Sequence, residues 1–128
     1  CNVNIDMLRA AYEVFSNDPE VKGEQVLQIA ELSMRNLVAG DGNIDTRDFL
    51  ARADLLCATG MTVLISDYFE YYRLRAYLNN FTKLKIGIVI GIPSLLDIFD
   101  PKYYTDLEGG ILESFGRLFK NNVSIFYF

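Results

Sequence analysis

Three short apolar runs, separated by segments with a helical pattern, constrain the fold of this chain more than any other feature. The runs cover residues 62–65, 85–90 and 123–128. A continuous apolar run of this length is typical of a strand buried on both faces. Strands that alternate with helices form parallel sheets with right-handed crossovers. Residues 61–128 therefore predict an α/β fold with a β-α-β-α-β parallel, Rossmann-like sheet, and so few strands predict that the sheet is incomplete.

The first sixty residues have helical patterns instead. Ile5, Leu8, Tyr12 and Phe15 recur at helical spacing, and an Asn-Asp-Pro sequence follows them. Further helices are predicted over residues 23–38 and from Asp45 or Thr46 to Gly60; those two polar residues are capable N-caps, and Gly60 suits the left-handed position after a helix. The sequence thus predicts one domain over residues 1–128, with about three helices in 1–60 and the α/β part in 61–128.

Local signals also place the helices between the strands. Asp67 and Glu70 have the spacing of a capping box, which predicts a helix from Asp67 to about residues 79–80. Pro93 suits a first helical turn, and Asp100-Pro101 restarts a helix in the same way. A Gly-Gly pair at 109–110 then interrupts the chain before another apolar helical face.

Both ends of the sequence suggest a fragment of a longer protein. The chain starts at Cys1 rather than at a methionine, and it stops at Phe128 within a strand-like run. We expect sequence beyond Phe128 to contribute to the fold.

Composition excludes several classes of partner. The net charge is −5, and the basic residues are scattered, whereas nucleic-acid binding needs a basic face. The longest apolar run, residues 86–92, is far shorter than the roughly 20 residues that span a bilayer. No signal-peptide pattern is present. Cys1 and Cys57 form no disulfide framework, and Cys57 is predicted to be a buried, inert thiol. We therefore expect a cytoplasmic protein that binds neither nucleic acid nor membrane.

Missing residue types limit the chemistry. The chain has no histidine, so Ser-His-Asp and Cys-His catalytic systems are excluded. It contains no phosphate-binding loop motif and no dinucleotide fingerprint. Residues 41–49 resemble the second half of an EF-hand loop, but alignment on Gly42 and Asp48 puts Leu37 and Ala39 where oxygen ligands are needed. The sequence predicts a helix connection there, with no metal, no cofactor and no catalytic residue.

The ends of the first two predicted strands are the strongest candidate for a ligand site. Ser66 and Asp67 follow one strand, and Gly91 and Ser94 follow the next. In open α/β sheets, ligands bind at the carboxyl ends of strands, near the free N–H groups of helices. If the two strands are neighbours, these four residues form a site for phosphate or a small anion. The competing interpretation is that Asp67 and Ser94 are helix caps and that Gly91 turns the chain.

Two resemblances bear on this site. Residues 55–78, with Thr62-Val63-Leu64-Ile65-Ser66, are similar to the second motif region of haloacid-dehalogenase-type hydrolases. That resemblance implies a Rossmann-like shape in which Ser66 contacts a phosphate. The nucleophile motif of that family, two aspartates one residue apart after a strand, is absent: Asp67-Tyr68-Phe69 has only the first.

Residues 59–66 and 100–119 together resemble the C-terminal region of long bacterial proteins described as nicotinate-nucleotide adenylyltransferase-like. This resemblance implies nucleotidyl transfer in the parent protein. The histidine motif of that activity is absent from this chain, so the catalytic part would lie elsewhere.

Aromatic residues are the remaining feature. Residues 68–72 contain four aromatic side chains, which spread around more than one side of a helix. They are buried between the sheet and the N-terminal helices, or they face a second copy or another domain. We therefore expect a non-catalytic scaffold or interaction domain whose partners are other domains of the parent protein or a homo-oligomer. The alternative is a phosphate- or nucleotide-binding half-domain of a transferase or phosphohydrolase, with its site at the strand ends.

Overall fold

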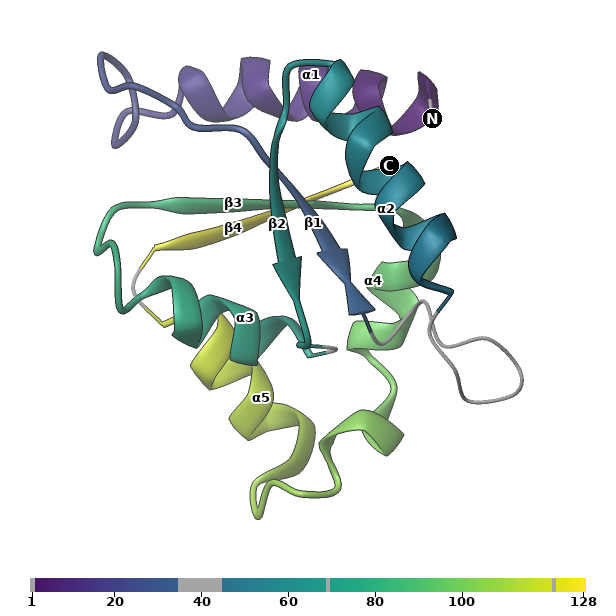
Figure 1. Cartoon of the computed structure of the whole chain (residues 1–128). Helices are drawn as coiled ribbons and strands as arrows, with labels where there is room; N and C mark the ends of the chain where they lie inside the picture. Colours follow the sequence, from purple (N-terminus) through teal and green to yellow (C-terminus); the bar gives the residue numbers. More distant parts are fainter. Residues whose placement is uncertain (1, 35–44, 69, 121) are drawn as a thin grey trace. The chain divides into compact units, whose positions relative to one another are not determined.

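A computed structural model describes residues 2–34, 45–68, 70–120 and 122–128 (Figure 1). The chain has a mixed α/β fold, as predicted, and every strand in these described segments belongs to a parallel pair. It divides into two compact units: a small unit, Leu27–Phe69, and a large unit, Cys1–Val26 with Glu70–Phe128. Among the described residues, each unit contains one pair of strands, and the two units are described separately below.

The small unit is a single strand–helix–strand (βαβ) motif. Strand β1 (Ile29–Ser33) pairs with β2 (Thr62–Ser66) in parallel, from Ile29 opposite Thr62 to Ser33 opposite Ser66. Helix α2 (Thr46–Ala58) lies in the connection and contacts β2. The parallel register brings the carboxyl ends of both strands to the same edge.

The ends of α2 confirm the predicted caps. The Asp45 carboxylate accepts hydrogen bonds from the N–H groups of Arg47 and Asp48, at 3.0 and 3.1 Å. Gly60, two residues after the last helical residue, has φ +81°, a conformation that glycine adopts without strain. These signals are local, and the sequence therefore revealed them.

The predicted helix over residues 23–38 is wrong at its centre, where the structure has β1. Ala30, Glu31 and Leu32 favour a helix by intrinsic propensity. The parallel ladder with β2 overrides that preference, because it gives the backbone of this segment its hydrogen-bond partners. Residues 35–38 of that prediction lie outside the described residues.

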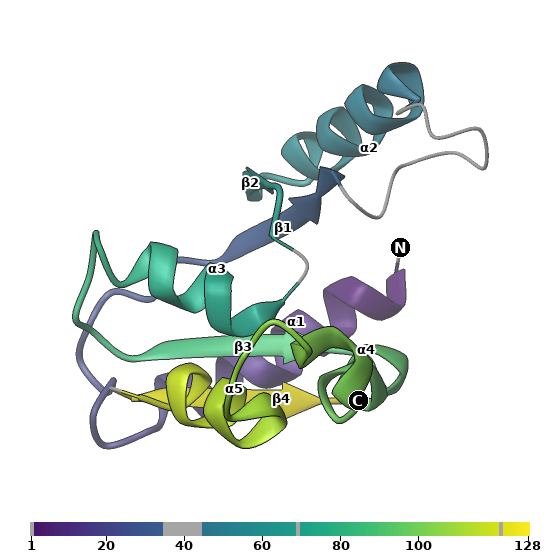
Figure 2. The ribbon, with the colours of Figure 1, turned by 90° about the horizontal axis from the view of Figure 1, so that it is seen from below.

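The large unit contains the other parallel pair. Its elements are α1 (Asn2–Ser16), α3 (Tyr71–Leu78), β3 (Ile86–Ile90), α4 (Ile92–Ile98), the 3-10 helix η2 (Pro101–Tyr104), α5 (Gly110–Leu118) and β4 (Val123–Tyr127). Strand β4 pairs with β3 from Ile86 opposite Val123 to Ile90 opposite Tyr127. Helices α3 and α5 lie side by side (Figures 1 and 2).

One face of the β3–β4 pair carries the main core. Tyr72 of α3, Tyr104 of η2 and Leu118 of α5 form a buried cluster. Ile88 and Ile125, on neighbouring strands, pack against this cluster. The core therefore joins α3, η2 and α5 to this face.

Helix α1 packs on the opposite face. Gly87 precedes the core residue Ile88 by one position in β3, and Phe126 follows the core residue Ile125 by one position in β4. Side chains alternate between the two faces of a strand, so Gly87 and Phe126 lie on the face opposite the core. The Phe15 ring of α1 meets the Phe126 ring edge-on, with centroids 6.1 Å apart. The large unit is therefore layered, with helices on both faces of its strands.

The predicted start of the helix after β2 is wrong by several residues. Helix α3 begins at Tyr71, and its N-cap is Glu70, which makes no side-chain capping hydrogen bond. The sequence signal at Asp67 therefore marks no helix start. By contrast, a helical segment does restart at Asp100-Pro101, as predicted, in the form of the short 3-10 helix η2. Asp100 is its N-cap, and the Asp100 carboxylate accepts a hydrogen bond from the Lys102 N–H at 3.0 Å.

An ion pair ties the segment after α1 to the start of β3. The Lys85 ammonium lies 2.8 Å from Asp18 and 3.5 Å from Glu20. The hydrogen bond from Lys85 is the main reason that the pKa of Asp18 is lowered. A carboxyl with a lowered pKa in the folded state stabilises the protein above its unfolded pKa, and this contribution disappears as the pH falls through the folded value.

We expect Asp18→Asn to flatten the acid limb of the stability profile. The melting temperature of the wild type should fall more steeply than that of Asp18→Asn as the pH drops below about 4. Thermal melts followed by circular dichroism over a pH series would measure this. Glu24→Gln, at an exposed position of the same unit, is the control and should follow the wild type. Parallel curves for the wild type and Asp18→Asn would contradict the expectation.

Candidate functional site

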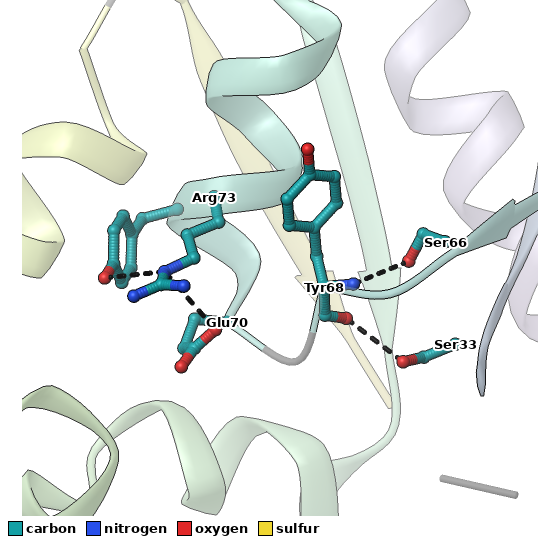
Figure 3. A network of polar contacts seen from close by, with 6 residues as sticks. Ser33, Ser66, Tyr68, Glu70 and Arg73 are labelled. Carbon is teal, nitrogen blue, oxygen red and sulfur yellow. Dashed lines mark hydrogen bonds and ion pairs between the residues drawn. The ribbon is translucent and has the colours of Figure 1, made fainter. Parts of the chain in front are cut away.

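The carboxyl edge of the β1–β2 pair brings two serines together. Ser33 and Ser66 are register partners at the last position of each strand, and their exposed fractions are only 7% and 8%. Both side chains appear in Figure 3, on either side of the segment that leaves β2. A pair of buried hydroxyl groups therefore lies at this edge of the small unit.

The two hydroxyl groups hold the residue that follows the strand (Figure 3). The backbone N–H of Tyr68 donates to Ser66 Oγ at 3.2 Å, and Ser33 Oγ donates to the Tyr68 carbonyl at 3.1 Å. The Ser66 hydroxyl in turn donates to the Glu31 carboxylate. Both serines are thus used to fix the backbone after β2.

The electrostatics of this edge disfavour an anion. Glu31 is an exposed residue, but its carboxyl group is partly buried, and burial raises its pKa while the bond from Ser66 partly offsets the rise. A phosphate that contacted Ser66 would have to displace the Glu31 carboxylate or lie beside it. The negative charges of a phosphate and of an ionised Glu31 carboxylate side by side would repel each other. The contacts therefore favour a structural role for Ser66.

The four predicted site residues fall in two places. Ser66 and Asp67 stand at and after the end of β2, in the small unit. Gly91 is the N-cap of α4, and Ser94 lies in the first turn of that helix, in the large unit. Strands β2 and β3 belong to different pairs, so the condition on which the shared site depended is not met among the described strands. The ligand site remains a prediction.

The sequence interpretation missed Ser33 and Glu31. Both lie in β1, which was predicted as helix, and a helix would have placed them far from any strand end. The alternation of Ile29, Glu31 and Ser33 on one face of β1 was the available signal. It is weak because only a few residues carry it.

We expect Ser66→Ala to destabilise the small unit by about 1–2 kcal/mol, because the Tyr68 N–H and the Glu31 carboxylate each lose a partner. Chemical denaturation followed by circular dichroism would measure the loss. Ser94→Ala, at a half-buried position in the first turn of α4, is the control and should change stability by no more than about 0.5 kcal/mol. Equal effects of the two substitutions would show that the Ser66 hydroxyl does not hold this segment.

The large unit has a second polar network around Tyr72. Arg73 Nε donates to the Tyr72 hydroxyl at 3.1 Å and lies 3.6 Å from the Glu70 carboxylate (Figure 3). The Tyr104 hydroxyl donates to the Ile98 carbonyl at 2.6 Å, and burial raises the pKa of Tyr104. Both tyrosine hydroxyls thus have partners inside the unit, which favours a role in the core.

Arg75 is the most buried charged residue described, with an exposed fraction of 5%. Its guanidinium donates to the Lys120 carbonyl, just beyond the C-terminal end of α5. The carbonyl end of a helix carries partial negative charge and stabilises a cation there. Arg75 therefore links α3 to the end of α5.

A surface of exposed apolar side chains crosses α4 and α5. We call it the α4–α5 strip, and its members are Leu96, Phe99, Leu112, Phe115 and Phe119. The exposed fractions are 65% for Leu96, 56% for Phe99, 78% for Leu112 and 48% for Phe119. The Phe115 ring joins the two helices, with its centroid 5.4 Å from that of Phe99 and 6.2 Å from that of Phe119.

Several further findings concern residues and features that were singled out from the sequence. Cys57 is exposed, so its predicted burial is wrong. No cluster of three or more potential metal ligands occurs in the described segments. Within those same segments, no helix is both long and apolar enough to cross a membrane. Residues 41–44 of the EF-hand-like stretch, together with Leu37 and Ala39, lie outside the described residues. Asp48, near the end of the stretch, pairs with Arg52 at 2.7 Å.

Comparisons of the chain with protein-family models, with curated proteins and with solved structures find no match. The functional argument therefore depends on the geometry alone.

Proposed function

We propose that this chain is a non-catalytic interaction domain that packs the α4–α5 strip against another protein surface. The exposure of the strip carries this proposal. At about 200 Å² for a large apolar side chain, its four exposed members present roughly 500 Å². Apolar patches of this size on soluble proteins often mark binding surfaces.

The polar groups support the same conclusion. The hydroxyls at the β1–β2 edge hold the backbone of Tyr68, and the core tyrosine hydroxyls have partners inside the large unit. A catalytic or ligand-binding site needs polar groups that are available to a substrate. The described clusters instead use these groups for folding.

Polar substitution in the strip tests this proposal. Leu112→Ser should leave the melting temperature nearly unchanged, because a binding surface contributes little to folding of the free chain. Loss of the fold would show that Leu112 belongs to the core.

A thermal-shift series with inorganic phosphate and nucleotides distinguishes this proposal from the alternative, a phosphate-binding half-domain. We expect no response, and a clear rise in melting temperature would replace our proposal with that alternative.

We propose further that the parallel pairs belong to a larger, Rossmann-like sheet. Parallel strands occur almost only in sheets that are covered on both faces, and an isolated pair is marginally stable. In β3, the Ile86 N–H bonds toward β4, so alternation directs the N–H groups of Gly87 and Val89 to the other edge. Slow hydrogen exchange at Gly87 and Val89 is expected if another strand pairs there. Fast exchange at both would contradict this proposal.

A further inference from the structure

Gly116 has no evident role within the described part of its own unit. It lies inside α5 without the left-handed conformation that would require glycine. A Cβ atom built there meets nothing within 4 Å. Glycine is one of the least favourable residues in a helix interior, so its presence at an open position needs another reason.

The position of Gly116 supplies that reason. It follows Leu112 by one helical turn and precedes Phe119 by three residues, so the three share one side of α5. Gly116 thus places a residue without a side chain between two large exposed members of the strip. A glycine at such a place lets the backbone of another helix approach closely, and it leaves room for a large side chain from that helix.

We propose that a second copy of this chain packs its α5 against this side of α5, with Phe119 of each copy over Gly116 of the other. This inference rests on the proposed interaction function and names its partner. A two-fold interface needs each contact to occur twice with the roles exchanged. Helix α5 and its C-cap together carry both the position that receives a side chain, Gly116, and the protruding Phe119, which makes this surface complementary to itself.

Area and charge agree with a second copy as the occupant. Two strips of roughly 500 Å² each would bury about 1,000 Å² in total, which is about the smallest area expected of a biological interface and fits a weak, concentration-dependent dimer. The charges on α5 are already paired within the chain, since Arg117 lies 2.6 Å from Glu113. Strip residues carry no charge, so the net charge of −5 acts only at longer range, where salt screens it.

Sedimentation velocity of the full chain over a wide concentration range tests the proposal. The wild type should shift from monomer to dimer as its concentration rises. Gly116→Leu and Phe119→Ser should each weaken dimerisation about tenfold or more. Gly116→Leu should also keep or raise the melting temperature, because the position is open in the monomer and leucine favours a helix. Weaker association together with a stable fold cannot come from misfolding.

Phe81→Ser is the matched control. Phe81 is 74% exposed and lies outside the strip, so its substitution should leave the dimer unchanged. Dimers that tolerate both Gly116→Leu and Phe119→Ser would overturn this inference, while the strip would remain a proposed surface for a different partner. A monomer at every concentration would also overturn it. In that case the thermal-shift series with phosphate and nucleotides decides the proposed function separately.

Discussion

Leu118→Ala is expected to lower the free energy of unfolding of the large unit by about 3 kcal/mol. Leu118 is the most buried large side chain described, with an exposed fraction of 1%, and it contacts the Tyr72–Tyr104 cluster. Removing its side chain loses apolar burial and leaves a cavity that aromatic neighbours fill poorly. Urea denaturation followed by far-ultraviolet circular dichroism would measure the loss.

Leu112→Ala is the matched control, because Leu112 lies on the same helix and is 78% exposed. Its effect on the free chain should stay within about 0.5 kcal/mol. The pair separates the two apolar sides of α5, one facing the core and the other in the α4–α5 strip. Similar losses for both variants would show that the strip is covered in the folded chain, which would contradict the proposed function as well.

The two sides of α5 illustrate how far sequence periodicity reaches. The pattern of Ile111, Leu112, Phe115, Leu118 and Phe119 predicts an apolar helix, and α5 is there. The pattern does not distinguish the side that meets the core from the side that stays exposed. Only the positions of Tyr72 and Tyr104, from distant parts of the sequence, decide that.

Strands were predictable where they were apolar and rich in β-branched residues. Strands β2, β3 and β4 coincide with the three apolar runs. Strand β1 was not predictable in this way, because Ala30, Glu31 and Leu32 favour a helix and only the ladder with β2 makes them a strand. Strand pairing depends on residues far apart in sequence, and a local pattern carries no information about it.

In the candidate site, too, local features were predictable from the sequence, whereas contacts between distant residues were not. Ser66 was correctly placed at a strand end, since the end of an apolar run is a local signal. The partners of Ser66 were not predicted, because Ser33 becomes its neighbour only through the register of β1 with β2. Gly91 and Ser94 were likewise placed correctly at the start of a helix, but they follow a strand of the other pair. Position along the chain was predictable, and proximity was not.

Gly87→Val is expected to destabilise the large unit by about 2 kcal/mol, although valine favours strands. A Cβ atom at Gly87 would lie 3.2 Å from the rings of both Phe15 and Phe126. Valine adds two methyl groups to that space, so α1 must move off the strands or the rings must leave their edge-on contact. Chemical denaturation would measure the loss, and near-ultraviolet circular dichroism would report the disturbed aromatic packing.

Gly116→Ala is the control for this prediction, because a Cβ atom there meets nothing within 4 Å. It should stabilise the free chain by up to about 1 kcal/mol through helix propensity. Changes of opposite sign in the free energy of unfolding for Gly87→Val and Gly116→Ala would show that Gly87 is required for close packing of α1. They would also show that the monomer does not require a glycine at position 116. A stabilising Gly87→Val would mean that α1 does not pack on this face in solution. Gly87 is the third residue of the strand predicted over residues 85–90, so its position inside a strand was evident from the sequence. The reason for a glycine there was not, because it lies in Phe15, more than seventy positions earlier.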